Sequence, residues 1–115
     1  MRLEMTEQEL VNLIIEYLRR KRCFVWRNNT AFRVFNYTTK AGENKTRAIR
    51  SGIKGSSDII GLTRLGKFIA VECKIGKNKT TVEQDIFLHE VKMRGGLGIV
   101  AYSLDEVIDK MGGEL

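Results

Sequence analysis

The feature that most constrains this chain is a pair of short apolar runs separated by only a few residues. Ser57–Leu62 and Phe68–Lys74 are rich in apolar and β-branched residues, and Gly55 and Gly76 bound them. Runs of this kind, with turn residues on either side, are typical of β-strands. Because the connection between them is short and contains a glycine, we expect two antiparallel strands joined by a tight turn.

The second of these strands combines a buried character with charged residues at its end. Side chains alternate between the two faces of a strand, and both faces of Phe68–Lys74 are apolar until Glu72 and Lys74. Charges at the end of a buried strand are costly unless they are paired or bind a cation. Asp58, at the start of the partner strand, brings a second carboxylate to the same place. Two carboxylates and a lysine there indicate a site for a hard divalent cation beside a phosphodiester.

Residues 6–20 have the pattern of an amphipathic helix. Thr6 is expected to cap its N-terminus, with Glu9 reaching back to the Thr6 amide in a capping box. Glu7 projects along the centre of the apolar stripe, whereas Glu9 and Glu16 point roughly the opposite way. Two interpretations of Glu7 are open. It complements the helix dipole, which the residues alone favour, or it is a further carboxylate of the candidate site.

A second helix is expected from the capping box Thr80–Glu83 to about Arg94. Gln84 lies on its inner stripe, one turn into the helix that follows the Glu72 strand. A carboxamide there can hold Lys74 or a phosphate without adding charge. The alternative is a partly buried glutamine bonded to backbone. A further strand over 97–102 and a final helix from residue 103 complete an α/β order with a mixed central sheet.

The segment between the first helix and Asp58 is expected to contain two strands and a long loop. Cys23–Arg27 and Ala31–Tyr37 have extended character. Their aromatic residues are interpreted as core or sheet-face side chains, with base stacking as the open alternative: Trp26, Phe32, Phe35 and Tyr37. Residues 38–55 lack apolar periodicity and are expected to form a basic loop that contacts a phosphate backbone. For each residue taken singly, a solvated hairpin tip is an equally open alternative. The candidate nucleic-acid contacts are Lys40, Lys45, Arg47, Arg50 and Lys54.

Asp58 followed by Glu72-Cys73-Lys74 resembles the D…(D/E)-x-K signature of restriction-endonuclease-like nucleases. The longer string Gly55–Gly61, then Ala70–Lys74 and Gln84, looks like the VRR-NUC branch, the virus-type replication-repair nucleases. The resemblance runs from about residue 6 to residue 103. Ser57 stands where this family often has a proline, a position without a chemical role.

The resemblance implies a single VRR-NUC-like domain over residues 1–115, with a restriction-endonuclease-like core whose mixed β-sheet is flanked by helices. It implies Mg²⁺-dependent hydrolysis of DNA, with Mn²⁺ able to substitute. The implied catalytic residues are Glu7, Asp58, Glu72, Lys74 and Gln84. The implied metal ligands are Asp58, Glu72 and the backbone carbonyl of Cys73. Similar stand-alone domains are often carried by phages, and some are homodimers that resolve four-way (Holliday) junctions.

The composition limits the classes of partner and compartment. A formal charge of +6 and a pI near 9.6 favour a polyanionic partner. The apolar runs are shorter than a membrane span. Cys23 and Cys73 indicate a reducing, cytoplasmic setting rather than a disulfide framework, and His89 alone does not make a zinc site.

Two other classes of function remain open on the sequence. One is a catalytically silent DNA-binding module on the same fold. The other is a small basic RNA-binding domain in which Asp58, Glu72 and Lys74 form only a buried ion-pair cluster. In the second case Glu72→Ala would strongly destabilise the fold, because it leaves Lys74 without its partner. In a metal site, removing one carboxylate from a self-repelling cluster leaves stability nearly unchanged or improves it.

Overall fold

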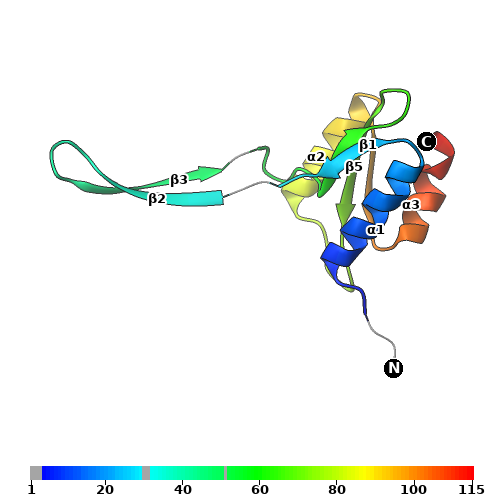
Figure 1. The fold of residues 1–115 in the computed structure, drawn as a ribbon, viewed down its shortest axis with the longest axis horizontal. Helices are drawn as coiled ribbons and strands as arrows, with labels where there is room; N and C mark the ends of the chain where they lie inside the picture. Colours follow the sequence, from blue (N-terminus) through cyan, green and yellow to red (C-terminus); the bar gives the residue numbers. More distant parts are fainter. Residues whose placement is uncertain (1–3, 30–31, 51) are drawn as a thin grey trace.

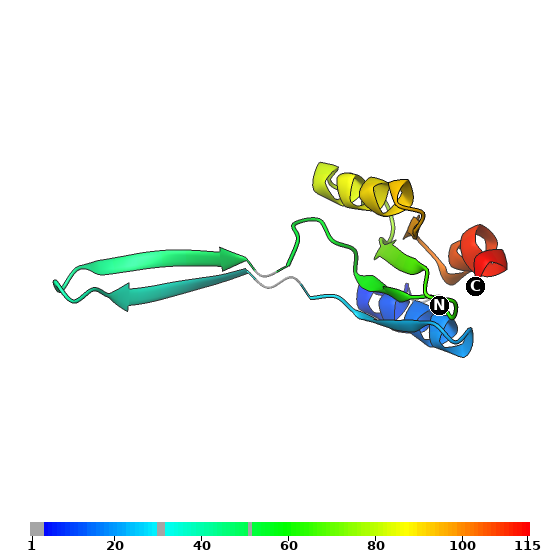
Figure 2. The ribbon, with the colours of Figure 1, turned by 90° about the horizontal axis from the view of Figure 1, so that it is seen from above.

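The protein consists of a mixed α/β body and a β-hairpin that projects from it (Figures 1 and 2). The computed structural model describes residues 4–29, 32–50 and 52–115. Its extents are 60 × 42 × 25 Å and its radius of gyration is 17.5 Å. A compact chain of this length has a radius of gyration of about 13 Å. The projecting hairpin accounts for the difference.

The described chain contains three α-helices and two sheets, in an order that matches the α/β class expected from the sequence. The elements are α1 Glu7–Arg20, β1 Phe24–Arg27, β2 Phe32–Thr38, β3 Asn44–Arg50, β4 Ile59–Leu62, β5 Phe68–Cys73, α2 Val82–Met93, β6 Leu97–Ala101, α3 Leu104–Met111 and a short 3₁₀ turn Gly112–Glu114. None of these helices combines the length and the apolar character needed to cross a membrane.

The central sheet has four strands in the order β1-β4-β5-β6. The predicted antiparallel pair is confirmed, since β4 and β5 pair from Ile59↔Val71 to Leu62↔Phe68. β6 lies parallel to β5 and is reached through α2, so the sheet is mixed. β2 and β3 form the separate two-stranded sheet of the hairpin.

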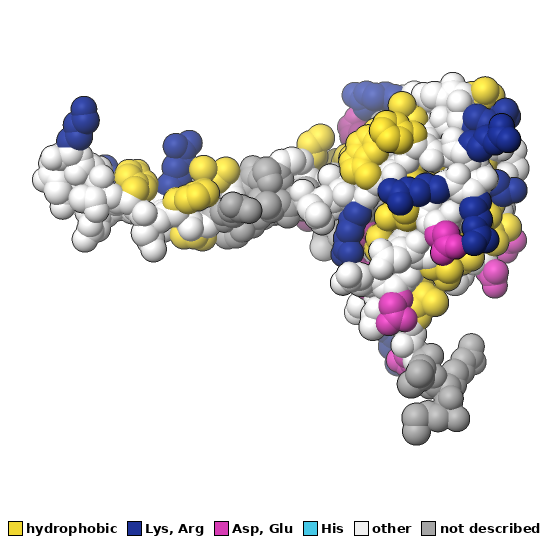
Figure 3. Space-filling view, in the orientation of Figure 1, with side chains coloured by type: hydrophobic (Ala, Val, Ile, Leu, Met, Phe, Trp, Pro, Cys, Tyr) yellow, Lys and Arg dark blue, Asp and Glu magenta, His cyan; other side chains and the backbone are white. Residues whose placement is uncertain are grey.

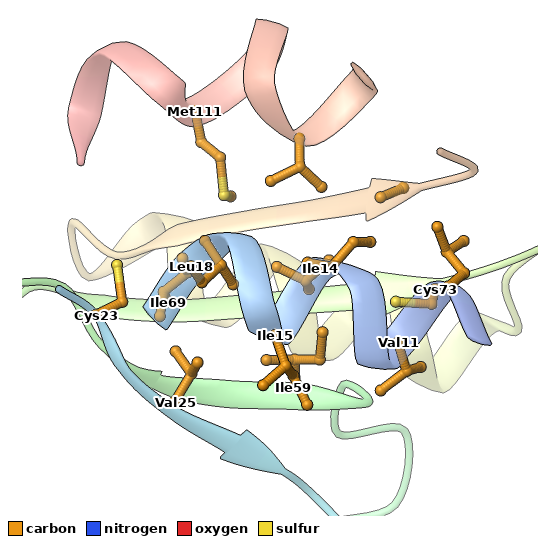
Figure 4. Close-up of a cluster of buried hydrophobic side chains, with 14 residues drawn as sticks. Val11, Ile14, Ile15, Leu18, Cys23, Val25, Ile59, Ile69, Cys73 and Met111 are labelled. Atoms are coloured by element: carbon orange, nitrogen blue, oxygen red, sulfur yellow. The ribbon is translucent and has the colours of Figure 1, made fainter. Parts of the chain in front are cut away.

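Helices cover both faces of the central sheet. Helices α1 and α3 pack on one face and α2 on the other, as Figure 2 shows. Ile14 and Ile59 are fully buried at the centre of the larger cluster, and each such side chain contributes about 1.5–3 kcal/mol to folding. Figure 4 shows the members of this cluster from both sheet and helices, including Val11, Ile15, Leu18, Val25, Ile69, Cys73 and Met111.

The predicted N-cap of α1 is confirmed, and the predicted N-cap of α2 is displaced by one residue. The Thr6 hydroxyl accepts from the Glu9 amide, as predicted, but the Glu9 carboxylate bonds the Thr6 hydroxyl rather than its amide. Thr81, not Thr80, caps α2, so the partner in that capping box is Gln84. The prediction was displaced by one residue because both threonines can cap, and Thr80 instead donates to Asp85 at 2.6 Å.

The expectation of a loop over residues 38–55 is wrong for its central part. Residues 44–50 form β3, which pairs with β2 from Thr38↔Asn44 to Phe32↔Arg50. The sequence has no apolar periodicity in this strand because the hairpin does not pack against the body, and neither of its faces is buried. The Thr46 hydroxyl also donates across the pair to Asn36 Oδ1 at 3.1 Å.

Of the two predicted places for the aromatic residues, core or sheet face, the described side chains occupy the sheet face and not the core. Trp26, Phe35 and Tyr37 are between 43% and 46% exposed. They lie on sheet faces with no helix over them. The side chain of Phe32 falls outside the described part of the structure. Cys23 and Cys73 are both free and buried.

Candidate active site at the end of the central sheet

The pairing of β4 with β5 brings Asp58 and Glu72 to one end of the sheet. Asp58 lies one residue before β4, and Glu72 is the second-last residue of β5. The Cys73 amide donates to Asp58 Oδ2 at 2.8 Å, which ties the two strand ends together through a side chain. The sequence-predicted carboxylates therefore do meet.

The segment that leads into Asp58 is held by Asn28. The Asn28 amide donates to the Asp58 carbonyl at 2.7 Å. Its side-chain Nδ2 donates to Ser56 Oγ at 2.7 Å and to the Ser57 carbonyl at 3.1 Å. The sequence gives no signal for this role of Asn28. No periodicity marks it, because its role depends on a segment almost thirty positions further along the chain.

Two glycines permit close approaches around this segment. Gly55 has φ +82°, and a Cβ there would lie 2.4 Å from the carbonyl carbon of Glu83 in α2. A Cβ on Gly61 would lie 2.1 Å from the Phe24 carbonyl oxygen in β1. From the sequence, Gly55 is only a residue that bounds the strand pair. Instead it lets the loop before Asp58 lie directly against the start of α2.

Glu72 is the centre of the site, and only 2% of the residue is exposed. Its two oxygens have different surroundings. Oε1 accepts from Gln84 Nε2 at 3.0 Å and lies 3.7 Å from Lys74 Nζ. Oε2 is buried and has no hydrogen-bond partner among the described residues. A buried carboxylate oxygen without a partner is unfavourable, so this oxygen can gain from one more hydrogen bond or from contact with a cation.

Gln84 reaches Glu72 because of its place in the capping box. Its Oε1 accepts from the Thr81 amide at 2.9 Å, while its Nε2 donates to Glu72. The helix cap therefore orients the Gln84 side-chain amide, and its NH₂ group is directed at Glu72. The bond with the Thr81 backbone matches the predicted alternative of a glutamine bonded to backbone, whereas the contact with the Glu72 carboxylate was not among the predicted contacts.

The cluster of Glu72, Asp58, Glu7 and Lys74 carries more negative than positive groups. Burial, and after it the charge of Asp58, raise the pKa of Glu72 from an ordinary value of 4.5 to about 8, although the charge of Lys74 opposes them. A side-chain hydrogen bond with Asp58 acts in the same direction as burial. Glu7 adds a smaller contribution in the same direction. Burial, followed by the charges of Asp58 and Glu72, also raises the pKa of the Cys73 thiol. That thiol is therefore neutral and is not a nucleophile.

The structure distinguishes Glu7 from Glu9 at the start of α1. Glu7 is half-buried, and its charge reaches both Glu72 and Cys73. Glu9 is exposed and occupied with the helix cap. The partial burial and the charge of Glu7 favour the interpretation in which it belongs to the carboxylate cluster over the one in which it only complements the helix dipole.

The donor set fits a hard divalent cation. With all groups ionised, Glu7, Asp58 and Glu72 against Lys74 carry a formal charge of −2, and Arg27 is a weaker positive influence on Cys73. Within residues 4–29, 32–50 and 52–115, no three His, Cys, Asp or Glu side chains converge as a metal-binding group. The carboxylates of Asp58 and Glu72 are two candidate oxygen donors of the kind that hard divalent cations prefer.

The predicted nucleic-acid contacts divide between the body and the hairpin. Lys54 lies in the body, where its Nζ is 3.2 Å from Glu83 Oε1. Lys40, Lys45 and Arg47 lie on the hairpin, and the side chain of Arg50 falls outside the described residues. Figure 3 shows dark blue Lys and Arg side chains beside yellow hydrophobic ones along the hairpin. The structure therefore does not bring this set to the carboxylates.

Comparison of the sequence with protein-family models finds no match, and no curated protein matches it either. The function must therefore be argued from the chemistry of the site. That site consists of one buried carboxylate with an open oxygen, a second carboxylate fixed by a backbone amide, a lysine and an oriented carboxamide.

Proposed function

We propose that this protein is a Mg²⁺-dependent endodeoxyribonuclease with a restriction-endonuclease-like core of the VRR-NUC type. The observation that carries the proposal is the state of Glu72. Its carboxylate is buried, one oxygen is satisfied by Gln84 and Lys74, and the other has no partner among the described residues. A divalent cation shared with Asp58 would supply both the missing partner and the missing charge.

Asp58 and Glu72 hold the cation in this proposal, with the Cys73 carbonyl as an expected third donor. Asp58 is preoriented because the Cys73 amide occupies its Oδ2. When bound, Mg²⁺ polarises the phosphate and lowers the pKa of a water molecule. Mn²⁺ has similar oxygen preference and substitutes for it.

Lys74 acts on the reacting groups directly. Its side chain is only 13% exposed, and its Nζ lies 3.7 Å from Glu72 Oε1, so its charge is held at the edge of the cluster. From there the ammonium group orients the attacking water and stabilises negative charge that develops on the phosphate. Gln84 keeps Glu72 in place through Oε1. Glu7 adds negative potential that favours cation binding.

The proposed substrate is branched DNA, and the proposed active form is a homodimer. Lys40, Lys45, Arg47 and Lys54 supply phosphate contacts that do not depend on base sequence. Two active sites related by a two-fold axis match the symmetry of a four-way junction. The dimer and the junction preference rest on the resemblance to VRR-NUC domains.

The test is cleavage of labelled DNA by the purified protein with Mg²⁺, with Mn²⁺ and with EDTA. Single-stranded, duplex, flap and four-way-junction substrates are run in parallel. Glu72→Gln and Lys74→Met are the site variants. Glu16→Gln is the matched control, because Glu16 is an exposed acid paired only with Arg20 on the surface of α1. We expect metal-dependent cutting that both site variants abolish and the control retains.

Several outcomes would contradict the proposal. Binding of every DNA without cutting indicates the silent DNA-binding module. Preference for RNA, together with strong destabilisation by Glu72→Gln, indicates the RNA-binding alternative. Unpaired nicks on the junction and a monomer in sedimentation would remove the dimeric part of the proposal while leaving the nuclease in place.

A further inference from the structure

One face of the β2–β3 hairpin combines aromatic and basic side chains. Residues directly opposite one another in an antiparallel pair share a face. Phe35 is opposite Arg47, and Tyr37 is opposite Lys45, so both rings and both cations lie on the same face. Ile49 belongs to this face as well, since it lies two residues beyond Arg47 on β3.

The opposite face of the hairpin carries Val34 and Ala48 beside two pairs of polar side chains that bond to one another. The Thr46 hydroxyl donates to Asn36 Oδ1, and the Thr38 hydroxyl donates to Asn44 Oδ1, each at 3.1 Å. These amide and hydroxyl groups stabilise the pairing of the strands. The chemistry available to a partner is therefore concentrated on the aromatic and basic face.

The aromatic and basic face is open to solvent and hollowed. Phe35 is 45% exposed and Tyr37 is 46% exposed. A hollow of about 350 Å³ is lined by Phe35, Tyr37, Arg47 and Ile49. Figures 1 and 2 show from two directions that the hairpin projects away from the body. Large aromatic side chains exposed in such an arrangement mark an interaction surface.

The charge of the hairpin selects a polyanion over a second copy of the chain. Residues 32–50 contain five cationic residues and Glu43, which gives +4 of the +6 carried by the whole chain. Two hairpins packed face to face would bring like charges together. A nucleic acid complements both the cations and the aromatic rings of this face, because its phosphates pair with the cations and its bases stack on the rings.

The rings distinguish unpaired from paired nucleotides. In a duplex the faces of each base are already covered by its neighbours, so exposed rings stack only on bases that have left the helix. We propose that the face formed by Phe35, Tyr37, Lys45 and Arg47 binds unpaired nucleotides. This inference deepens the proposed function and rests on it: the substrate is DNA with a single-stranded segment beside the bond that is cut.

The hairpin is attached at the candidate active site. It is inserted between β1 and β4, whose last pair is Arg27↔Ile59. One step beyond this pair, the Asn28 amide donates to the Asp58 carbonyl at 2.7 Å. Each seven-residue strand spans about 23 Å. A single strand bound along the hairpin is therefore led toward Asp58.

The test measures binding in EDTA, where no cleavage occurs, by fluorescence anisotropy of labelled single-stranded and duplex oligonucleotides of equal length. The aromatic variant is Phe35→Val with Tyr37→Val, because valine keeps the strand propensity of the hairpin while removing the rings. The matched control is Val34→Thr on the opposite face, where Val34 is also exposed and threonine likewise keeps the strand propensity. Circular dichroism melts verify that each variant is folded.

We expect the aromatic variant to bind single strands on the order of tenfold to a hundredfold more weakly, with duplex affinity changed less than about twofold. The control should bind like the wild type. Lys45→Gln with Arg47→Gln should weaken binding to both DNAs and reduce the salt slope on single strands by about 1.4.

An equal loss on duplex and single strand in the aromatic variant would overturn the inference in favour of groove binding. No loss on either would overturn it as well. Conversion of a dimer to a monomer by the aromatic variant, seen in sedimentation, would assign the face to a second copy. The binding assay is independent of catalysis. A wild type that never cuts but shows the expected binding loss therefore contradicts only the proposed function.

Discussion

Replacing Glu72 by glutamine in the absence of divalent cations should abolish a pH dependence of folding that the wild type shows. In the folded protein the pKa of Glu72 is about 8, because of burial and the neighbouring Asp58 charge, whereas its ordinary value is 4.5. Between these values the folded state keeps a proton that the unfolded state has released. The free energy of unfolding therefore falls as pH rises from 4.5 to 8 and is constant with respect to this group outside that range.

The size of the effect follows from the same two values. The full difference corresponds to at most about 5 kcal/mol lost by pH 8, on the order of 1.4 kcal/mol for each pH unit. Glutamine is neutral, has nearly the same shape and still accepts from Gln84 Nε2 through its amide oxygen. At pH 8 we therefore expect Glu72→Gln to be more stable than the wild type, and at pH 5 we expect the two to be nearly equal.

The assay is urea denaturation in EDTA at several pH values between 5 and 8, for the wild type, Glu72→Gln and Glu16→Gln. Other groups titrate in this range, so the quantity compared is the difference between variant and wild type at each pH. The exposed control Glu16→Gln should follow the wild type, because its carboxyl is in solvent. Adding Mg²⁺ at pH 8 should stabilise the wild type by about 2.7 kcal/mol at a hundredfold excess over Kd and leave Glu72→Gln unchanged.

The reasoning is refuted if Glu72→Gln is destabilised at pH 8 by about 3–5 kcal/mol. That magnitude is typical of breaking a buried ion pair, and it would mean that the contact between Glu72 and Lys74 dominates the cluster. The carboxylates would then form a structural ion-pair network rather than a cation site.

Three further perturbations follow from the geometry. Gly55→Ala should lower the free energy of unfolding by about 1–3 kcal/mol in urea denaturation, because the new Cβ meets Glu83 at 2.4 Å and φ is +82°; equal stability would mean that the loop relaxes freely. Asn28→Ala removes two side-chain bonds to the segment before Asp58 and should cost about 1–3 kcal/mol. Its cleavage rate measured well below the melting transition should fall as well, and an unchanged rate would exclude a positioning role. Cys73 should resist iodoacetamide at pH 8 in the folded protein, because burial and nearby carboxylates raise the pKa of its thiol, and should react once urea unfolds the chain; rapid labelling of Cys73 in the folded protein, located by mass spectrometry, would contradict its burial.

Local signals in the sequence were sufficient for most elements of the body. The Thr6 cap, the strand pair on either side of a short turn and the parallel strand after α2 depend on neighbouring residues or on periodicity. Asp58 and Glu72 were found for the same reason, since charges at the end of an apolar strand stand out against their surroundings.

Local signals failed where contacts are distant or where no core is near. β3 has no apolar periodicity because neither face of the hairpin is buried, so its residues were interpreted as a loop. The exposure of Phe35 and Tyr37 follows from the same isolation. The role of Asn28 depends on Ser56 and Ser57, and no short-range pattern records such a pairing.

The sequence by itself determined which residues are available at the site: the carboxylates, Lys74 and Gln84 occur in strands and helices that periodicity and caps define. Only the tertiary structure decided what each atom does. It assigned Glu72 Oε1 to Gln84 and left Oε2 without a described partner, and it brought Glu7 near enough for its charge to raise the pKa of Glu72. The physical reason is that periodicity records which face of an element is buried, whereas hydrogen-bond partners and charge balance depend on the elements packed against that face.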